Sequence, residues 1–270
     1  MYKKLLEKLI IVFLNLTIEG DEMKSLDIHN TIPFEIKNIK AIVFDLDGTI
    51  YPAKQFENQI KPNMVKHAAK TLNIDEESAR KTLALYRKEF RSSVLGLQKY
   101  HEIDPKIFLE SVFNDIDTSS ALMYPGLLEE LQLLSTKKSL KLLTNSNYSH
   151  AEKMVTKFNL TNVFDNIYSV DDWNFIRKPN IEVFDGLVER LNLPSESILI
   201  VDDSYLNLEI AHHKGMRTML VSNQIVEAPY YWEMHKREKH LPQSFIDLAA
   251  HNITTLVKEI NNVLIKNSNT

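Results

Sequence analysis

The chain has 270 residues, enough for one large domain or for a core domain that carries a smaller insert. Its composition, 44% hydrophobic and 25% charged, is typical of a globular protein with a sizeable core and excludes intrinsic disorder over most of the length. The formal net charge of −4 argues against polymeric nucleic acid as a ligand, because it provides no basic field for counterion release. The absence of cysteine excludes disulfides and cysteine nucleophiles, and the six glycines are too widely spaced for a glycine-rich nucleotide-binding loop.

Residues 1–38 differ in pattern from the rest and are predicted to form a leader, either helical or disordered. Lys3, Lys4 and Lys8 precede the uncharged run Leu9–Ile18, as in the basic and apolar parts of a signal peptide. The run is too short to cross a bilayer, which needs about 20 apolar residues, and no small-residue cleavage site follows it. Together with the missing cysteines, this favours a cytoplasmic protein without a membrane span, with secretion as the alternative.

From residue 39 onward, short apolar runs alternate with helical patterns, which predicts an α/β fold with a doubly wound, Rossmann-like parallel sheet. The predicted strands are Ile39–Phe44, Leu140–Leu143, Ile198–Val201 and Met219–Val221. Two helix starts are indicated between them. Ser149 and Glu152 have the spacing of a capping box, and Pro179 is placed as a first-turn proline.

Between the first two strands the pattern is helical throughout, around Met64–Leu72, Ser78–Phe90 and Lys106–Phe113. We therefore expect residues 39–51 and 123–270 to form an α/β catalytic core and residues 52–122 to form a helical cap inserted after the first strand. Some rings and cations of the cap could receive a nucleobase and ribose, although such residues more often pack between helices: Tyr86, Arg87, Phe90, Arg91, Tyr100, His101 and Phe108. Tyr230, Tyr231 and Trp232 are expected to pack onto the core, with an interaction patch as the alternative.

The ends of the predicted strands carry the chemistry. Asp45 and Asp47 follow the first strand and point to the same side of an extended chain, so that their carboxylates share either a proton or a divalent cation. Gly48 then allows a tight turn. Neighbouring negative charge is expected to raise the pKa of Asp47.

Three further strand ends and loops complete the pattern. Thr144 and Asn145 follow the second strand, and Lys178 precedes a helix start. Asp202 and Asp203 close the third strand, where Ser204 and Asn207 can hydrogen-bond around them. In a parallel sheet all strands deliver their carboxyl ends to one edge, where such folds bind ligands. Four carboxylates, a hydroxyl and an ammonium at one edge predict a magnesium and phosphate site.

The ordered set Asp45-Leu46-Asp47-Gly48-Thr49, Leu143-Thr144-Asn145, Lys178-Pro179 and Val201-Asp202-Asp203-Ser204 resembles the four motifs of the haloacid dehalogenase-like hydrolase superfamily. The resemblance spans residues 39–221. It implies that Asp45 is the nucleophile that forms an aspartyl phosphate and that Asp47 is the general acid and base. It also implies that Thr144, Asn145 and Lys178 hold the phosphate, and that Mg²⁺ is bound at Asp45, Asp47, Asp202 and Asp203.

A finer resemblance points to the pyrimidine 5′-nucleotidase branch, through three motifs: Leu95-Gly96-Leu97 with His101, Tyr124-Pro125-Gly126-Leu127-Leu128, and Asp202-Asp203-Ser204 with Asn207. Gly48 departs from it, because many members of that branch are expected to carry Asn there. The resemblance implies a magnesium-dependent phosphatase, a hydrolase for a nucleoside 5′-monophosphate. The alternatives are a phosphatase or phosphomutase for a sugar phosphate or phosphoglycolate, and a non-catalytic phosphate-binding or regulatory protein. The oligomeric state stays open.

Overall fold

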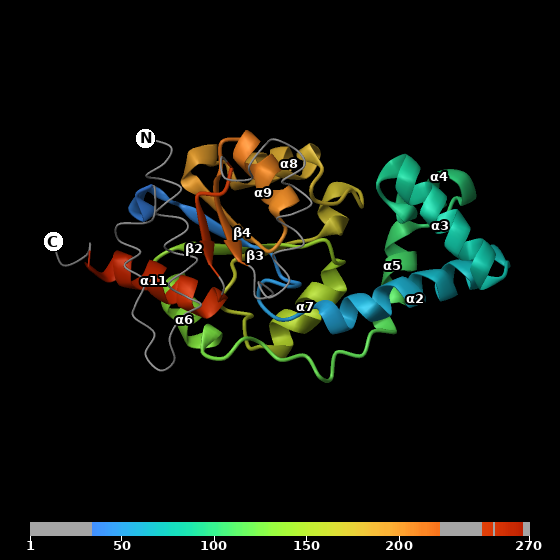
Figure 1. The fold of residues 1–270 in the computed structure, drawn as a ribbon, viewed down its shortest axis with the longest axis horizontal. Helices are drawn as coiled ribbons and strands as arrows, with labels where there is room; N and C mark the ends of the chain where they lie inside the picture. Colours follow the sequence, from blue (N-terminus) through green and yellow to red (C-terminus); the bar gives the residue numbers. More distant parts are fainter. Residues whose placement is uncertain (1–33, 222–244, 251, 267–270) are drawn as a thin grey trace, which may run out of the picture. The chain divides into compact units, whose positions relative to one another are not determined.

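The computed structural model describes residues 34–221, 245–250 and 252–266. Its centre is a parallel sheet of six strands in the order β3-β2-β1-β4-β5-β6 (Figure 1). The strands are β1 Ala41–Phe44, β2 Ser139–Leu143, β3 Asn166–Tyr168, β4 Ile198–Asp202, β5 Arg217–Val221 and β6 Leu248–Ala250. Helices cover both faces, with α8 (Ile181–Leu191) and α9 (Tyr205–His213) on one face and α6 (Leu127–Ser135), α7 (Tyr148–Lys157) and α11 (Ile253–Lys266) on the other. The predicted α/β class is confirmed.

The register of the central strands brings their carboxyl ends level. All residues of β1 and β4 are buried, as their continuous apolar sequences predict for strands with neighbours on both sides. Phe44 at the end of β1 lies opposite Leu142 of β2 and Val201 of β4. The residue after Phe44 is Asp45, and the residue after Val201 is Asp202. Both carboxylates therefore lie at the same edge of the sheet.

Two strands and two helix starts differ from the sequence-based expectation. The short edge strands β3 and β6 were not predicted, because neither has a continuous buried run: β3 is buried only at Tyr168. Helix α7 begins at Tyr148 because the side chain of Asn147 accepts a hydrogen bond from the backbone of His150, so the predicted capping box is wrong. Helix α8 begins after Pro179, with Asn180 as its N-cap.

The segment between β1 and β2 contains the helices α2 (Lys54–Leu72), α3 (Glu76–Phe90), α4 (Ser93–His101) and α5 (Pro105–Asn114). Asp104 caps α5 and Pro105 opens it. Helices α3 and α4 pack closely at Gly96, where a Cβ atom would lie 2.2 Å from Cγ of Tyr86. The hydroxyl of Tyr86 in turn lies 2.6 Å from Nε2 of His101. This pair of rings is part of the packing between the helices of this segment, which is called the cap below.

Within the described residues, no helix is long and apolar enough to cross a membrane. Tyr230, Tyr231 and Trp232 lie outside the described residues, as do residues 1–33 of the expected leader. The described end of that leader contains a single 3₁₀ turn, η2 (Ile36–Asn38), in which Ile36 is buried.

Candidate active site

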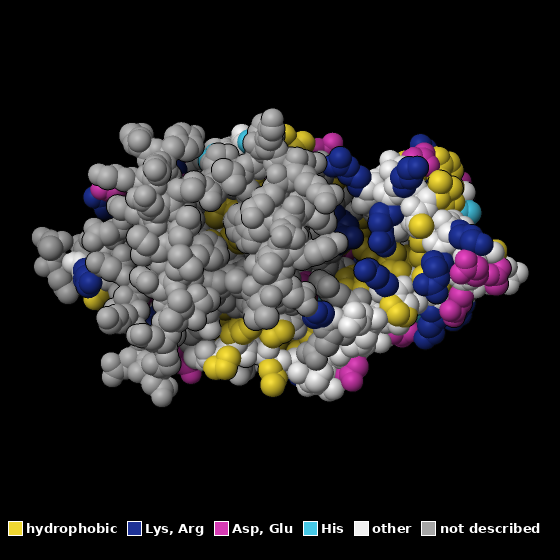
Figure 2. All heavy atoms as spheres, viewed as in Figure 1, with side chains coloured by type: hydrophobic (Ala, Val, Ile, Leu, Met, Phe, Trp, Pro, Cys, Tyr) yellow, Lys and Arg dark blue, Asp and Glu magenta, His cyan; other side chains and the backbone are white. Residues whose placement is uncertain are grey.

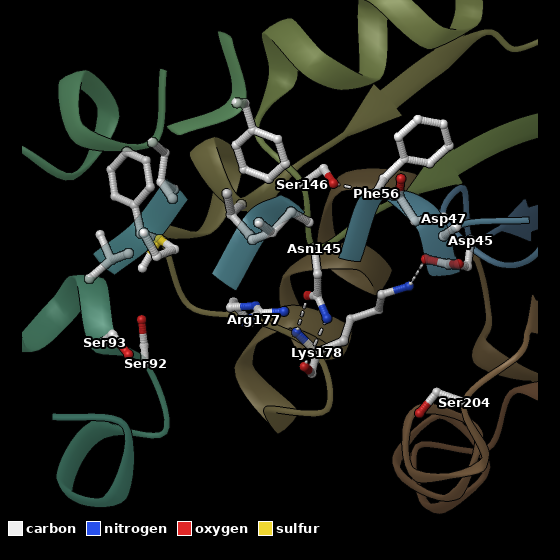
Figure 3. Close-up of a pocket in the computed structure, with 18 of the residues that line it drawn as sticks. Asp45, Asp47, Phe56, Ser92, Ser93, Asn145, Ser146, Arg177, Lys178 and Ser204 are labelled. Atoms are coloured by element: carbon white, nitrogen blue, oxygen red, sulfur yellow. Dashed lines mark hydrogen bonds and ion pairs between the residues drawn. The ribbon is translucent and has the colours of Figure 1, made fainter. Parts of the chain in front are cut away.

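The ammonium group of Lys178 connects two strand ends, and Figure 3 shows its contact with the first of them, at Asp45. Its Nζ atom donates hydrogen bonds to Asp45 Oδ1 at 2.8 Å, to Asp202 Oδ2 at 2.8 Å and to the backbone oxygen of Leu143 at 2.6 Å. Three protons thus meet three acceptors. Burial alone would lower the pKa of Lys178, but Asp202 and Asp45 outweigh burial and raise it above its usual range. The lysine therefore remains a cation in the protein interior.

Asp202 is held at both carboxylate oxygens. Its Oδ1 accepts hydrogen bonds from the backbone of Ser204 at 2.8 Å and from the side chain of Asn207 at 3.0 Å. The same Asn207 amide lies 3.0 Å from Oδ2, which also accepts from Lys178. Because Asn207 lies in the first turn of α9, the helix orients this carboxylate and, through it, the lysine.

Asp45, Asp202 and Asp203 together fit a divalent cation. One carboxylate oxygen of each lies within 4.8 Å of the others, and Mg²⁺ prefers carboxylate oxygens and water as ligands. Gly48 permits this approach: its φ is +99°, and a Cβ atom there would lie 2.2 Å from Asp203 Oδ2. The carboxylate of Asp47, expected to be a fourth ligand, is not one of the three that come this close.

Asp47 instead has its own set of partners beside this cluster. Its Oδ2 accepts hydrogen bonds from the hydroxyl of Thr144 at 3.0 Å and from that of Ser146 at 2.7 Å. Its Oδ1 accepts a hydrogen bond from the hydroxyl of Tyr51 and lies 3.5 Å from Nε2 of His150. The side chain of Asp47 is 24% exposed, and it lines the cavity described below.

The two carboxyls of the first motif have opposite pKa shifts. Burial, supported by the nearby Asp202 and Asp47, outweighs Lys178 and raises the pKa of Asp45 to about 7. Burial would also raise the pKa of Asp47, but hydrogen bonds from His150, Tyr51 and Ser146 to the carboxylate outweigh it and lower the value to about 2. The expectation of a raised pKa for Asp47 is therefore wrong for this structure, since hydrogen bonds to the carboxylate stabilise its charged form.

The two predicted phosphate-binding residues of the second motif are occupied within the protein. The hydroxyl of Thr144 donates to Asp47 and accepts from the backbone of Ser146 at 3.0 Å. The side-chain amide of Asn145 bonds the backbone of Lys178 twice, donating at 3.1 Å and accepting at 2.8 Å (Figure 3). Asn145 thereby positions the loop that carries Lys178.

A cavity of about 470 Å³ opens over these groups and extends beneath the cap. From the core, it is lined by Asp45, Asp47, Asn145, Ser146, Arg177, Lys178 and Asp203, among others. From the segment between β1 and β2, it is lined by Phe56, Ile60, Lys61, Met64, Arg87, Ser92, Ser93, Val94, Leu109 and Phe113, among others. Of the seven cap residues considered for nucleobase binding, only Arg87 lines this cavity.

Sequence reasoning gave no role to four residues that contact or surround the predicted groups: Tyr51, Ser146, His150 and Arg177. Ser146 could have been found, because it lies two residues after Thr144 and side chains alternate along an extended chain. Asn207 was expected to hydrogen-bond around the second acidic pair, and its side-chain amide does so at Asp202. Nothing local to Tyr51 or His150 indicates their contact with Asp47.

A model of the haloacid dehalogenase-like hydrolase family matches residues 42–221. The chain belongs to this family. Among curated relatives it is 27% identical over 197 residues to a glyceraldehyde 3-phosphate phosphatase of Methanocaldococcus jannaschii, over 68% of this chain and 85% of the relative. It is 23% identical over 189 residues to a phosphorylated carbohydrates phosphatase of Thermotoga maritima, over 66% of this chain and 82% of the relative.

The fold is similar to that of solved structures of haloacid dehalogenase-like proteins. A phosphatase of this type from Thermococcus onnurineus aligns with a TM-score of 0.54 at 20% identity, over 82% of this chain and 98% of that chain. The predicted enzyme class of this chain is a phosphoric monoester hydrolase of the haloacid dehalogenase-like type. The family and the curated relatives support this class.

Proposed function

We propose that the chain is a magnesium-dependent phosphatase that hydrolyses a small phosphomonoester through an aspartyl phosphate at Asp45. One observation carries the proposal. Asp45, the cation Lys178 and Asp203 line one cavity, and the buried Asp202 is bonded to Lys178 and lies close to the other two carboxylates. Asp47 lines the same cavity with separate partners. Nucleophile, charge neutralisation and proton transfer are thereby assigned to different side chains of one site.

In the first step, a carboxylate oxygen of Asp45 attacks phosphorus, and the bond from phosphorus to the ester oxygen breaks as Asp47 gives a proton to the leaving alcohol. In the second step, Asp47 takes a proton from the attacking water, and the bond from phosphorus to Asp45 breaks to release inorganic phosphate. A phosphate dianion bound next to Asp47 raises its pKa, because a like charge disfavours the carboxylate, and so favours the protonated form needed first.

Asp45, Asp202 and Asp203 would hold Mg²⁺, which supplies positive charge that neutralises the phosphate and the surrounding carboxylates. Lys178 adds a second positive charge, 2.8 Å from both Asp45 Oδ1 and Asp202 Oδ2, and Asn145 holds its loop in place. Thr144 contributes through Asp47, to which its hydroxyl donates.

For the substrate, we favour a sugar phosphate or another small phosphorylated carbohydrate over a nucleotide. The names of the two phosphatases compared above favour this class. The cap rings considered for a base, such as Tyr86 and His101, pack within the cap. Lys61, Arg87 and Arg177 line the cavity together with the hydroxyls of Ser92 and Ser93, which suits a polar, anionic ligand. Figure 2 shows several Lys and Arg side chains on the visible face of the cap helices.

A nucleoside 5′-monophosphate is the second candidate. The rings of Phe56, Phe113 and Phe175 line the same cavity and could stack against a base. The motif Leu95-Gly96-Leu97, one of the three on which the finer resemblance rests, has a structural explanation in the close packing of Gly96 against Tyr86.

A panel of phosphomonoesters tests the proposal, with phosphate release measured in Mg²⁺ and again in excess chelator. Glyceraldehyde 3-phosphate, hexose 6-phosphates, phosphoglycolate, UMP and CMP are the informative members. We expect magnesium-dependent release led by the carbohydrate esters. Leadership by UMP and CMP would select the nucleotidase, and isomerised sugar phosphate without release, seen by ³¹P NMR, would select a phosphomutase. No turnover of any ester would contradict an enzymatic function.

A further inference from the structure

Two buried residues that no motif of the sequence analysis included, Tyr51 and His150, surround one oxygen of Asp47. Tyr51 is fully buried and His150 is 3% exposed. The hydroxyl of Tyr51 donates to Asp47 Oδ1, and Nε2 of His150 lies 3.3 Å from that hydroxyl and 3.5 Å from the same carboxylate oxygen. The two rings come from segments 99 residues apart in the chain.

The local structure explains why each ring reaches this point. Gly48 starts a tight turn in which its backbone N–H donates to the backbone oxygen of Tyr51 at 2.9 Å, so that the chain returns to Asp47 four residues later. His150 lies in the first turn of α7, where the side chain of Asn147 caps its backbone. Burial of these two polar groups would cost free energy if they had no hydrogen-bond partners. The carboxylate of Asp47 provides that partner, and the two groups in turn stabilise its charge.

Apolar rings complete the enclosure from both parts of the protein. The ring of Tyr51 lies 5.3 Å from that of Phe158 in the core and 5.5 Å from that of Phe56. The ring of Phe113, from cap helix α5, lies 5.0 Å from that of His150. These contacts limit the rotation of Tyr51 and His150, so their polar atoms keep a defined direction.

The donors of the cluster form a consistent chain. The hydroxyl of Tyr51 has one proton, with which it donates a hydrogen bond to Asp47. Its oxygen can therefore accept a hydrogen bond from Nε2–H of His150. Nδ1 of His150 is buried and has no hydrogen-bond partner among the described residues. The tautomer with its proton on Nε2 therefore leaves no buried N–H unpaired, which is the better arrangement.

We propose that Tyr51 and His150 are positioning residues that hold the carboxylate of Asp47 in the orientation needed for proton transfer. The inference rests on the proposed function, in which Asp47 exchanges a proton with the leaving alcohol and with water. Thr144 and Ser146 hold Oδ2, and the Tyr51–His150 pair holds Oδ1, so both oxygens of the carboxylate have fixed partners.

The leaving group of the substrate tests this role directly. An alkyl phosphate needs a proton on its leaving oxygen, whereas p-nitrophenyl phosphate releases a stable phenolate without one. For Tyr51→Phe, which keeps the ring and removes one hydroxyl, we expect kcat for the alkyl phosphate to fall about 10- to 100-fold with KM within about threefold. With p-nitrophenyl phosphate, we expect the first turnover to stay within about threefold of wild type, followed by a slower steady state as the aspartyl phosphate accumulates.

The cap supplies a matched control. Tyr86 and His101 form the same kind of pair, with the hydroxyl 2.6 Å from Nε2, but neither residue lines the cavity. Tyr86→Phe should leave the ratio of the two substrates unchanged. At the second position, His150→Gln keeps a donor near the Nε2 position and should retain more activity than His150→Leu, with equal protein folding checked by thermal melting.

Three outcomes separate the possibilities. If the wild-type protein turns over no phosphomonoester, the proposed function fails. If the wild type is active and Tyr51→Phe matches it on both substrates, the positioning role is wrong. Equal losses on the alkyl phosphate and in the first turnover of p-nitrophenyl phosphate would also contradict it, because they would indicate disturbed phosphate binding or folding rather than a misplaced proton-transfer group.

Discussion

The core and cap sides of the cavity treat charge differently. At the strand ends of the core, polar groups are matched with partners: Lys178 has three acceptors, and both oxygens of Asp202 are bonded. On the cap, the described salt bridges join other residues, such as Lys66 with Asp115, while within the described residues Lys61 and Arg87 form none. The comparison suggests that the core holds reacting groups in place and that the cap offers charge to the ligand.

The largest effect is expected from removing the nucleophile on the core side. Asp45→Asn should lower phosphate release by on the order of 10⁴-fold or more, because an amide cannot form the acyl phosphate. Phosphate release, together with mass spectrometry of acid-quenched enzyme to detect the phosphorylated aspartate, measures both consequences. Normal turnover by this variant would show that Asp45 is not the nucleophile. It would also contradict the inference that the core side of the cavity provides the reacting groups.

A large effect on stability is expected at Lys178. Lys178→Met leaves Asp45 and Asp202 buried without their cation, which should destabilise the fold by about 3–5 kcal/mol in urea unfolding without Mg²⁺. Lys141→Met is the control, because Lys141 pairs with Asp165, whose side chain is 53% exposed, and such a pair contributes about 1 kcal/mol or less. Equal losses of unfolding free energy in the two variants would show that the buried ion pairs of Lys178 contribute no more to stability than a partly exposed pair.

A smaller, more specific effect is expected at Gly48. In Gly48→Ala the new Cβ would collide with Asp203 and displace its carboxylate, so we expect the Mg²⁺ concentration for half-maximal activity to rise about tenfold. Gly126→Ala is the matched control: its φ of +73° carries similar backbone strain, but the nearest atom to the Cβ is Thr254 Cγ2 at 3.5 Å. If both variants showed the same rise in the Mg²⁺ concentration for half-maximal activity, backbone strain rather than the collision with Asp203 would be the cause.

The smallest effect is expected on the cap. Arg87→Ala should raise KM about three- to tenfold and leave kcat within about twofold, because a partly solvated cation contributes about 1 kcal/mol to the binding of an anion. Added salt should reduce the difference. Arg80→Ala, which breaks an exposed pair with Glu77 on the same helix, should change neither constant. A large fall in kcat for Arg87→Ala would place a reacting group on the cap.

Much of the core was predictable because its information is local. Asp45 and Asp202 each follow a continuous apolar run, and the geometry of parallel strands then places both at one edge. Short edge strands such as β3 escaped prediction because they lack such a run. The start of α7 escaped it because Asn147 and Ser149 are both good capping residues, and the register of the loop chooses between them.

For this protein, the sequence by itself determined the α/β class and the types of reactive side chain at the strand ends, because strand periodicity and motif order are properties of neighbouring residues. Only the tertiary structure decided which hydrogen-bond and ion-pair partners those side chains have. It directs Lys178 to Asp45 and Asp202, Asn145 to the backbone of Lys178, and the distant rings of Tyr51 and His150 to Asp47. The physical reason is that hydrogen bonds and burial are satisfied between segments far apart in the chain, and no local pattern records which partners they find.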